Sequence, residues 1–318
     1  MSDTLDVHVC EVGMRDGLQN VSVFMPTAEK LAWLEAEAAA GMPEMEVCSF
    51  VPPKLIPQFV DAAEVCARAL TIPGLVVTAL IPNLKGAERG IEAGVHKLNY
   101  VISVSESHNQ RNVRRSREES VADFVRIVER VRQVEPAKRP KLAVGLSTAL
   151  GCTIEGKVAE SEVVRLAVRM AQAGADELAV PDTVGYAGPA EVRRVFTAVM
   201  SAVKPLPVTA HFHDTRGQGI ANALAALDVG VRHFDACLAG LGGCPYAPGA
   251  SGNIVMEDLV FMLESIGLRT GVDLERLIAV RQILERALPG VPLHGGVGKA
   301  GLPKGFHPAT PPHAHAAE

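Results

Sequence analysis

Short apolar runs that suit buried β-strands alternate with amphipathic runs of helical period, and the pair repeats eight times along the chain. The expected strands are 7–12, 45–50, 75–81, 97–103, 142–147, 177–180, 208–213 and 234–239. The expected helices are 27–40, 61–70, 84–93, 117–133, 161–173, 190–203, 220–229 and 257–266. Eight such units favour an α/β fold closed into a (β/α)8 TIM barrel, with a doubly wound open sheet as the structural alternative.

Four of the expected helices end in a small apolar residue followed by glycine. These glycines are Gly41, Gly94, Gly174 and Gly230. A glycine just past a helix end takes the left-handed conformation that stops the helix. The positions therefore support the boundaries between each helix and the next strand.

The barrel is expected to occupy residues 1–267 as the catalytic domain. Residues 268–306 would form a short helical and loop extension that packs on the barrel, with a helix over 274–288 and a Gly-, Pro- and Lys-rich stretch after it. Residues 307–318 are rich in Pro, Ala and His, which predicts a disordered, solvated tail.

The formal net charge of −5 offers no basic footprint for nucleic acid. No apolar run approaches the ~18 residues that a membrane helix needs, and the polar start resembles no signal peptide. The six cysteines show no metal-type or disulfide-scaffold spacing, so a reducing, cytoplasmic location is expected. Apolar stripes on the outer helices allow a homodimer.

In a barrel of this kind the active site lies at the carboxyl ends of the strands. Arg15 and Asp16 follow the first expected strand at once. Taken alone, adjacent opposite charges in a loop are more often a surface ion pair than a site. Whether Arg15 and Asp16 belong to a site depends on the polar residues at the ends of the neighbouring strands.

The seventh expected strand ends in His211-Phe212-His213. Residues two apart on a strand point to the same side, so both imidazoles can reach one ion while Phe212 points away. A pair of core histidines is the alternative interpretation. Two histidines so placed at a strand's carboxyl end favour a metal site.

The segment after the eighth expected strand, residues 240–253, holds five glycines. Glycine lets a backbone approach a ligand closely. Cys244 lies within this segment as a candidate reactive thiol, although a lone cysteine is often inert packing. Asn253 at its end offers an amide oxygen to the same site.

Closure of the barrel places strand eight between strands seven and one, so Asp16, His211, His213 and Asn253 can converge on one ion. Two oxygen and two imidazole donors suit Mg²⁺ or Mn²⁺, with Zn²⁺ or Co²⁺ also possible. Weaker candidates are Glu46, which could orient Arg15, together with Asn112, Ser116, Asp182 and Thr183.

Three motifs together resemble the 3-hydroxy-3-methylglutaryl-CoA lyase family of metal-dependent barrel lyases. They are EVGMRDGLQN at 11–20, HFHDT at 211–215 and GLGGCPYAPGASGN at 240–253. Shorter matches at 49–54, 82–86, 149–157 and 181–185 extend the likeness over about residues 7–275. The glycine segment with its cysteine is the specific part.

The resemblance implies cleavage of an acyl-CoA with a tertiary 3-hydroxyl to acetyl-CoA and a keto acid, acetoacetate, as in leucine degradation. It also implies metal ligation by Asp16, His211, His213 and Asn253. Arg15 would stabilise an enolate, Cys244 would act as acid or base, and Glu46 would support the site. Arg15, Asn112 and Thr183 are the expected substrate contacts.

The chain departs from the family pattern outside the expected ligands, at Met14, Val21, Arg114, Arg115, Thr148, Thr153 and Arg216. The arginines could accept another carboxylate or a CoA phosphate, so citramalyl-CoA or another 3-hydroxyacyl-CoA is an alternative substrate. A condensing acyltransferase of the isopropylmalate or homocitrate synthase type is a second alternative. A non-catalytic metal-binding scaffold is a third.

Overall fold

Eight short parallel strands hydrogen-bond in chain order, and the eighth pairs with the first to close a barrel. They are β1 (His8–Glu11), β2 (Glu44–Ser49), β3 (Val76–Ile81), β4 (Lys97–Ser103), β5 (Lys141–Ser147), β6 (Glu177–Asp182), β7 (Val208–Phe212) and β8 (His233–Ala236). The computed structural model describes residues 5–243 and 252–310. The predicted barrel is confirmed, and the open-sheet alternative is wrong because β1 and β8 are paired.

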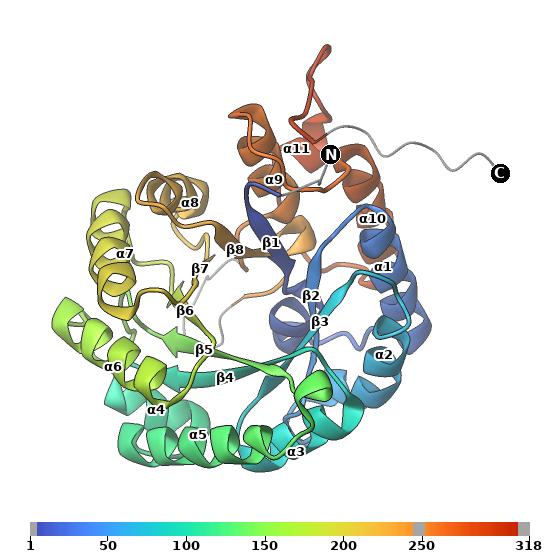
Figure 1. Ribbon diagram of the computed structural model, residues 1–318. Coiled ribbons are helices and arrows are strands. Elements are labelled where there is room, and N and C mark those ends of the chain that lie inside the picture. The colour runs from blue at the N-terminus through green and yellow to red at the C-terminus, as the bar shows by residue number, and fades with distance from the viewer. Residues whose placement is uncertain (1–4, 244–251, 311–318) are drawn as a thin grey trace.

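The helices surround the barrel (Figure 1). They are α1 (Thr27–Ala39), α2 (Ala62–Ala69), α3 (Leu84–Ala93), α4 (Glu106–Val113), α5 (Arg117–Arg132), α6 (Glu160–Ala173), α7 (Pro189–Val203), α8 (Gly219–Asp228), α9 (Met256–Ser265), α10 (Leu274–Ala287) and α11 (Val297–Ala300). Their buried apolar faces form one core with the outer faces of the strands. Across the described parts of the chain, no helix has the length and apolar character to cross a membrane.

The four glycines expected at helix ends all take positive φ. The φ angles are 91° at Gly41, 78° at Gly94, 114° at Gly174 and 104° at Gly230. A side chain would be strained in this conformation, so glycine ends each helix at low cost. The prediction of left-handed stops is confirmed.

Two boundaries differ from the sequence prediction at places that matter for the site. Strand β8 ends at Ala236 rather than at Ala239, because Ala239 has φ 56° and ψ 19° and turns the chain. The connection after β4, expected to be a loop, contains α4. Its sequence is too polar to show a buried stripe, and the helix is started by the Ser105 side chain, which accepts a hydrogen bond from the His108 amide.

The carboxyl-terminal part of the described chain lies against the outside of the barrel. Helix α10 contacts α1 and α9. The predicted start of the disordered tail, at residue 307, is too early in the chain. Thr310 is buried, and its amide donates to Glu264 Oε2 at 2.6 Å. Residues 311–318 lie outside the described residues.

A hydrogen-bonded ionic network fills the amino-terminal end of the barrel. Glu44 accepts from His8 Nε2 at 2.9 Å and lies 2.8 Å from Lys97 Nζ. Lys97 also contacts Glu177 Oε2 at 2.8 Å. Burial opposes the ionisation of Glu44, but the hydrogen bond from His8 and the charge of Lys97 lower its pKa to about 2.

Glu44→Gln is expected to remove a pH-dependent part of the free energy of unfolding. A carboxyl whose pKa falls from 4.5 to about 2 on folding stabilises the protein above pH 4.5, by about 3 kcal/mol. This stabilisation is lost as the pH falls from 4.5 toward 2, because the unfolded state then binds the proton more readily. Urea unfolding of the native chain and the variant at several pH values measures it. If the two free energies of unfolding differed by the same amount across this pH range, the assignment would be contradicted. Glu129→Gln, at an exposed glutamate, is the matched control.

Candidate active site

The chain turns sharply after β1 in a single π-helical turn, Gly13–Gly17. The Val12 carbonyl accepts from the amides of Arg15, Asp16 and Gly17. Glycine is required at position 13, because a Cβ there would lie 2.4 Å from Glu11 Oε1. The turn places Arg15 and Asp16 at the carboxyl-terminal end of the barrel, where the active site of such folds lies.

Arg15 is buried and held by two carboxylates. Its Nε donates to Glu46 Oε2 at 2.5 Å, and its Nη1 donates to Asp16 Oδ1 at 2.6 Å. Burial would lower the pKa of Arg15, but Asp16 and Glu46 outweigh burial and raise it. The guanidinium therefore stays charged and fixed in orientation. The expectation that Glu46 orients Arg15 agrees with this geometry.

The two histidines lie at the end of β7. His211 and His213 point to the same side of the strand, with ring centroids 5.4 Å apart. Phe212 points outward and packs against Phe196 of α7. Just beyond the strand, His213 forms an antiparallel bridge with Asn253, which brings the far end of the glycine segment to the site.

One carboxylate oxygen is the centre of the cluster. Asp16 Oδ2 lies 3.4 Å from His211 Nε2 and 3.4 Å from His213 Nε2, and it accepts from Asn253 Nδ2 at 2.6 Å. The ligand atoms of Asp16, His211 and His213 all lie within 4.8 Å of one another. The four residues expected to converge on one ion do lie together. They come from the turn after β1, from the end of β7 and from the segment after β8.

The chemistry of this donor set fits a divalent cation. Asn253 Oδ1 is buried and has no hydrogen-bond partner. Rotation of the amide by half a turn would exchange its oxygen and nitrogen, and would place Oδ1 beside Asp16 Oδ2. Two adjacent oxygens and two imidazole nitrogens would then surround one point, a donor set that a divalent cation satisfies.

The electrostatics of the cluster also favour a positive charge. Burial would raise the pKa of Asp16, but Arg15, His211 and His213 hold it well below its usual range. Burial would lower the pKa of His211, yet its contacts with Asp16 and Asp235 raise it to about 9. Carboxylates that stabilise an imidazolium in this way also stabilise a bound metal ion.

Three polar residues of the site were not predicted from the sequence. His211 Nδ1 lies 3.0 Å from Asp235 Oδ2, a contact that orients the imidazole. Asn99 Nδ2 donates to Glu46 Oε1 at 2.9 Å, and Gln19 Nε2 donates to Asp16 Oδ1 at 2.5 Å. Asp235 could have been found from register, because it is the partner of His211 in the β7–β8 pairing.

The other candidates differ in how the structure uses them. Thr183 Oγ1 accepts from the Thr148 amide at 2.8 Å, beside the barrel end. Asp182 accepts from two amides of the following loop and is a structural residue. Asn112 is exposed on α4, and no contact among the described residues joins it to the cluster.

The glycine segment approaches the Arg-Asp turn at both of its described ends. A Cβ on Gly242 would lie 2.9 Å from the Gly17 Cα, and Asn20 Nδ2 donates to the Gly243 carbonyl at 2.8 Å. Cys244 lies outside the described residues. The described residues on either side of 244–251 therefore lie next to the Arg-Asp turn, Gly243 through Asn20 and Asn253 through Asp16.

Two of the unusual arginines have protein partners. Arg115 donates to Asp123 and to the Pro82 carbonyl. Arg216 donates to the Gly185 carbonyl at 2.9 Å, with its guanidinium 4.5 Å from the centre of the Tyr186 ring. The idea that these arginines accept a substrate carboxylate or phosphate is therefore not favoured for either one.

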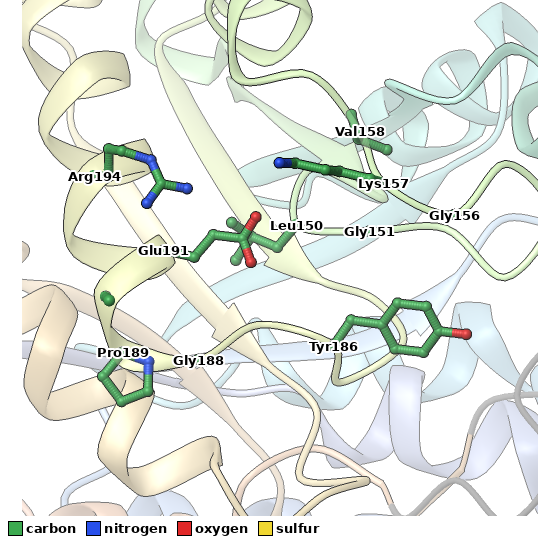
Figure 2. A pocket seen from close by; sticks show the side chains of 11 residues that line it. Leu150, Gly151, Gly156, Lys157, Val158, Tyr186, Gly188, Pro189, Glu191 and Arg194 are labelled. Atoms are coloured by element: carbon green, nitrogen blue, oxygen red, sulfur yellow. The ribbon is translucent and has the colours of Figure 1, made fainter.

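A cavity of about 630 Å³ lies between the β5–α6 connection and the first turns of α7 (Figure 2). Lys157, Tyr186, Glu191 and Arg194 line it, and none of the cluster residues does. Arg194 is paired with Glu160 at 2.9 Å, and Glu191 adds a negative charge. The cavity therefore has no net positive charge for an anion and is separate from the cluster.

Comparisons with known proteins agree on one family. The HMGL-like family model matches residues 6–284. Hydroxymethylglutaryl-CoA lyase of Bacillus subtilis is 38% identical over 287 residues, which cover 90% of this chain and 94% of that protein. A 3-hydroxy-3-isohexenylglutaryl-CoA/hydroxymethylglutaryl-CoA lyase of Pseudomonas aeruginosa is 40% identical, covering 87% and 91%. A structure of an HMG-CoA lyase from Acinetobacter baumannii with coenzyme A and 3-methylmalate superimposes with a TM-score of 0.89 at 41% identity, covering 97% and 99%.

Proposed function

The chain belongs to the HMGL-like family, and on that premise we propose that it cleaves a 3-hydroxy-3-methylglutaryl-CoA-like thioester to acetyl-CoA and acetoacetate. It is a carbon–carbon lyase. The observation that carries the proposal is the junction of a fixed guanidinium with a cluster of Asp16, His211 and His213. In a retro-Claisen cleavage a cation assists loss of the hydroxyl proton, and a fixed donor stabilises the enolate oxygen.

We propose Mg²⁺ or Mn²⁺ as the cofactor, held by Asp16, His211, His213 and Asn253. The donor set contains no thiolate, and its mixture of oxygen and imidazole suits these ions. Such an ion would neutralise charge on the substrate's 3-hydroxyl and a neighbouring oxygen, which lowers the pKa of the hydroxyl. Asp235 would keep the His211 ring in the orientation that presents Nε2.

The reaction itself sets what the protein side chains must do. The 3-hydroxyl passes its proton to the acid–base group of the site, for which we propose the Cys244 thiolate; the bond between C2 and C3 breaks, and C3 becomes the ketone carbon. The electron pair of that bond moves into the thioester enolate. Arg15 would stabilise the enolate oxygen, since its orientation is set in advance by Glu46 and Asp16.

The enolate carbon must then receive a proton to give acetyl-CoA. We propose that Cys244 returns the hydroxyl proton to this carbon, because both described ends of its segment lie against the Arg-Asp turn. Glu46 is a positioning residue that acts through Arg15. Thr183 and Asn112 remain proposed substrate contacts, with Thr183 supported by its place at the barrel end.

An acetyl-CoA release assay over a panel of 3-hydroxyacyl-CoAs tests the proposal. We expect the highest kcat/KM with 3-hydroxy-3-methylglutaryl-CoA, and lower values with citramalyl-CoA and with longer 3-alkyl chains. A preference for citramalyl-CoA would correct the substrate. Consumption of acetyl-CoA with a keto acid, and no cleavage, would instead support the condensing acyltransferase.

Alkylation is expected to inactivate the enzyme through Cys244 alone. The five cysteines in the described part of the chain, Cys10, Cys48, Cys66, Cys152 and Cys237, are all buried. Iodoacetamide should therefore label one site quickly, and activity should fall in proportion to the labelled fraction. Peptide mass mapping identifies the site. Full activity in a completely labelled enzyme would remove Cys244 as the proton donor, and Cys244→Ser is the matched variant.

We propose that the enzyme acts on acyl-CoA thioesters in the cytoplasm, as a homodimer. The buried, unpaired thiols of the described cysteines suit a reducing compartment. Light scattering of the purified chain tests the dimer.

A further inference from the structure

A buried carboxyl group links the two segments that form the site. Glu11, at the end of β1, accepts from the Gly13 amide at 2.6 Å. It also accepts from the Leu238 amide at 2.9 Å. Gly13 begins the turn that carries Arg15, and Leu238 begins the turn that leads into the glycine segment. Glu11 is fully buried, so these amides hold it in one orientation.

A second carboxyl group lies against the first. Glu37 of α1 is fully buried, and its carboxyl group and that of Glu11 both lie around Trp33 and Gly13, close enough to act on each other. Its Oε2 accepts from Trp33 Nε1 at 2.8 Å, and its Oε1 has no hydrogen-bond donor facing it. Two carboxylates cannot hydrogen-bond to each other unless one of them carries a proton.

The charges around the pair decide whether a proton must be present. The nearby Glu257 is neutralised by Arg281, whose Nη1 lies 2.6 Å from its Oε1. No ion pair joins a cation to Glu11 or Glu37 among the described residues. Burial, and then the neighbouring carboxyl group, raise the pKa of Glu37 well above its usual range. The pair therefore cannot hold two negative charges.

The hydrogen bonds indicate which member keeps the proton. Glu11 receives two backbone amides, and both require an acceptor. Glu37 receives only the Trp33 indole on Oε2, which leaves Oε1 free to carry hydrogen. We propose that Glu37 is a neutral carboxylic acid that donates to Glu11 and so fixes the acceptor geometry that ties the Arg15 turn to the β8 turn.

Glu37 and Glu11 are thus positioning residues, which act on the reactive groups through the turns at Gly13 and Leu238. The neutral pair also explains the buried indole. Trp33 lies under Gly13, where a Cβ would be 3.0 Å from the indole ring, and it needs an acceptor at this depth. The positioning role rests on the proposed function, in which the Gly13–Gly17 turn orients Arg15 for catalysis.

Two substitutions of Glu37 separate a neutral donor from an anion. Glu37→Gln keeps a donor for Glu11 and an acceptor for Trp33, so kcat and the Mn²⁺ dissociation constant should stay within about twofold of wild type. Glu37→Leu removes both hydrogen bonds, and kcat should fall about 10–100-fold with a smaller change in KM. Glu11→Gln places an N–H against a backbone amide and should be as damaging as Glu37→Leu.

Two measurements report on the site without turnover. Infrared spectroscopy should show the carbonyl band of a buried neutral carboxylic acid, and Glu37→Gln should remove it. Trp33 is the single tryptophan of the chain, so its fluorescence reports this site alone. Emission should be unchanged in Glu37→Gln and blue-shifted in Glu37→Leu. Glu35→Gln, on the exposed face of the same helix, is the matched control and should change nothing.

Equal damage by Glu37→Gln and Glu37→Leu would show that the anion is needed and would overturn the proposal. Absence of the infrared band would do the same. Wild-type Mn²⁺ binding and kcat in Glu37→Leu would remove the positioning role. If the wild-type chain released no acetyl-CoA, the proposed function would fail, whereas the infrared band and the Mn²⁺ affinities would still decide the state of Glu37.

Discussion

Arg15→Gln is expected to lower kcat by about 10²–10³-fold, the typical cost of one lost donor to a developing oxyanion. Nε and Nη1 of Arg15 are occupied by Glu46 and Asp16, and no described residue accepts from Nη2. The side chain is therefore held by two of its nitrogens and has one left for the substrate. Glutamine removes the positive charge and cannot reach as far. Initial rates of acetyl-CoA release measure the effect.

The controls distinguish a lost donor from a damaged site. Removal of Arg15 leaves Glu46 without its buried cation, so thermal stability and Mn²⁺ affinity must be measured with the rates. Arg15→Lys keeps the charge but loses the planar fork, and should retain a folded, Mn²⁺-binding protein with reduced kcat. Near-normal turnover in a well-folded Arg15→Gln would rule out enolate stabilisation by Arg15.

Much of the barrel could be predicted because its signals are local. Alternating apolar runs and glycine stops are readable from one segment at a time, and β4 and α3 were placed without error. The turn at Gly13–Gly17 could not be predicted in this way. It depends on one carbonyl that accepts three amides and on close packing against the segment after β8. Such a conformation has no local sequence pattern.

The residues of the site also differ in whether a local sequence pattern reveals them. His211 and His213 were predicted because their spacing has one geometric meaning on a strand. Asp235 and Asn99 were missed because single polar residues within strands acquire a role only when the register is known. Glu37 was missed for a further reason. A glutamate in the middle of a helix is ordinarily a solvated residue, and only its complete burial shows otherwise.

Treatment with EDTA is expected to abolish turnover, and Mg²⁺ or Mn²⁺ should restore it. An ion at this place is worth several kcal/mol of charge stabilisation, so the loss should be on the order of 10³-fold or more. The residual rate of the chelated enzyme measures the effect directly. Since chelation leaves every side chain in place, the result does not depend on the folding of a variant.

Asp16→Asn is the matching substitution, because it keeps the shape of the side chain and removes its charge. Asp16 Oδ2 is the one atom close to both imidazoles and to Asn253, so Mn²⁺ affinity should fall more than after any other single change in the cluster. Asp176→Asn, the same change at the opposite end of the barrel, should leave Mn²⁺ binding intact. Titration calorimetry with Mn²⁺ checks both variants. Full turnover by the chelated enzyme, or unaltered Mn²⁺ binding in Asp16→Asn, would show that these side chains meet for a reason other than a metal ion.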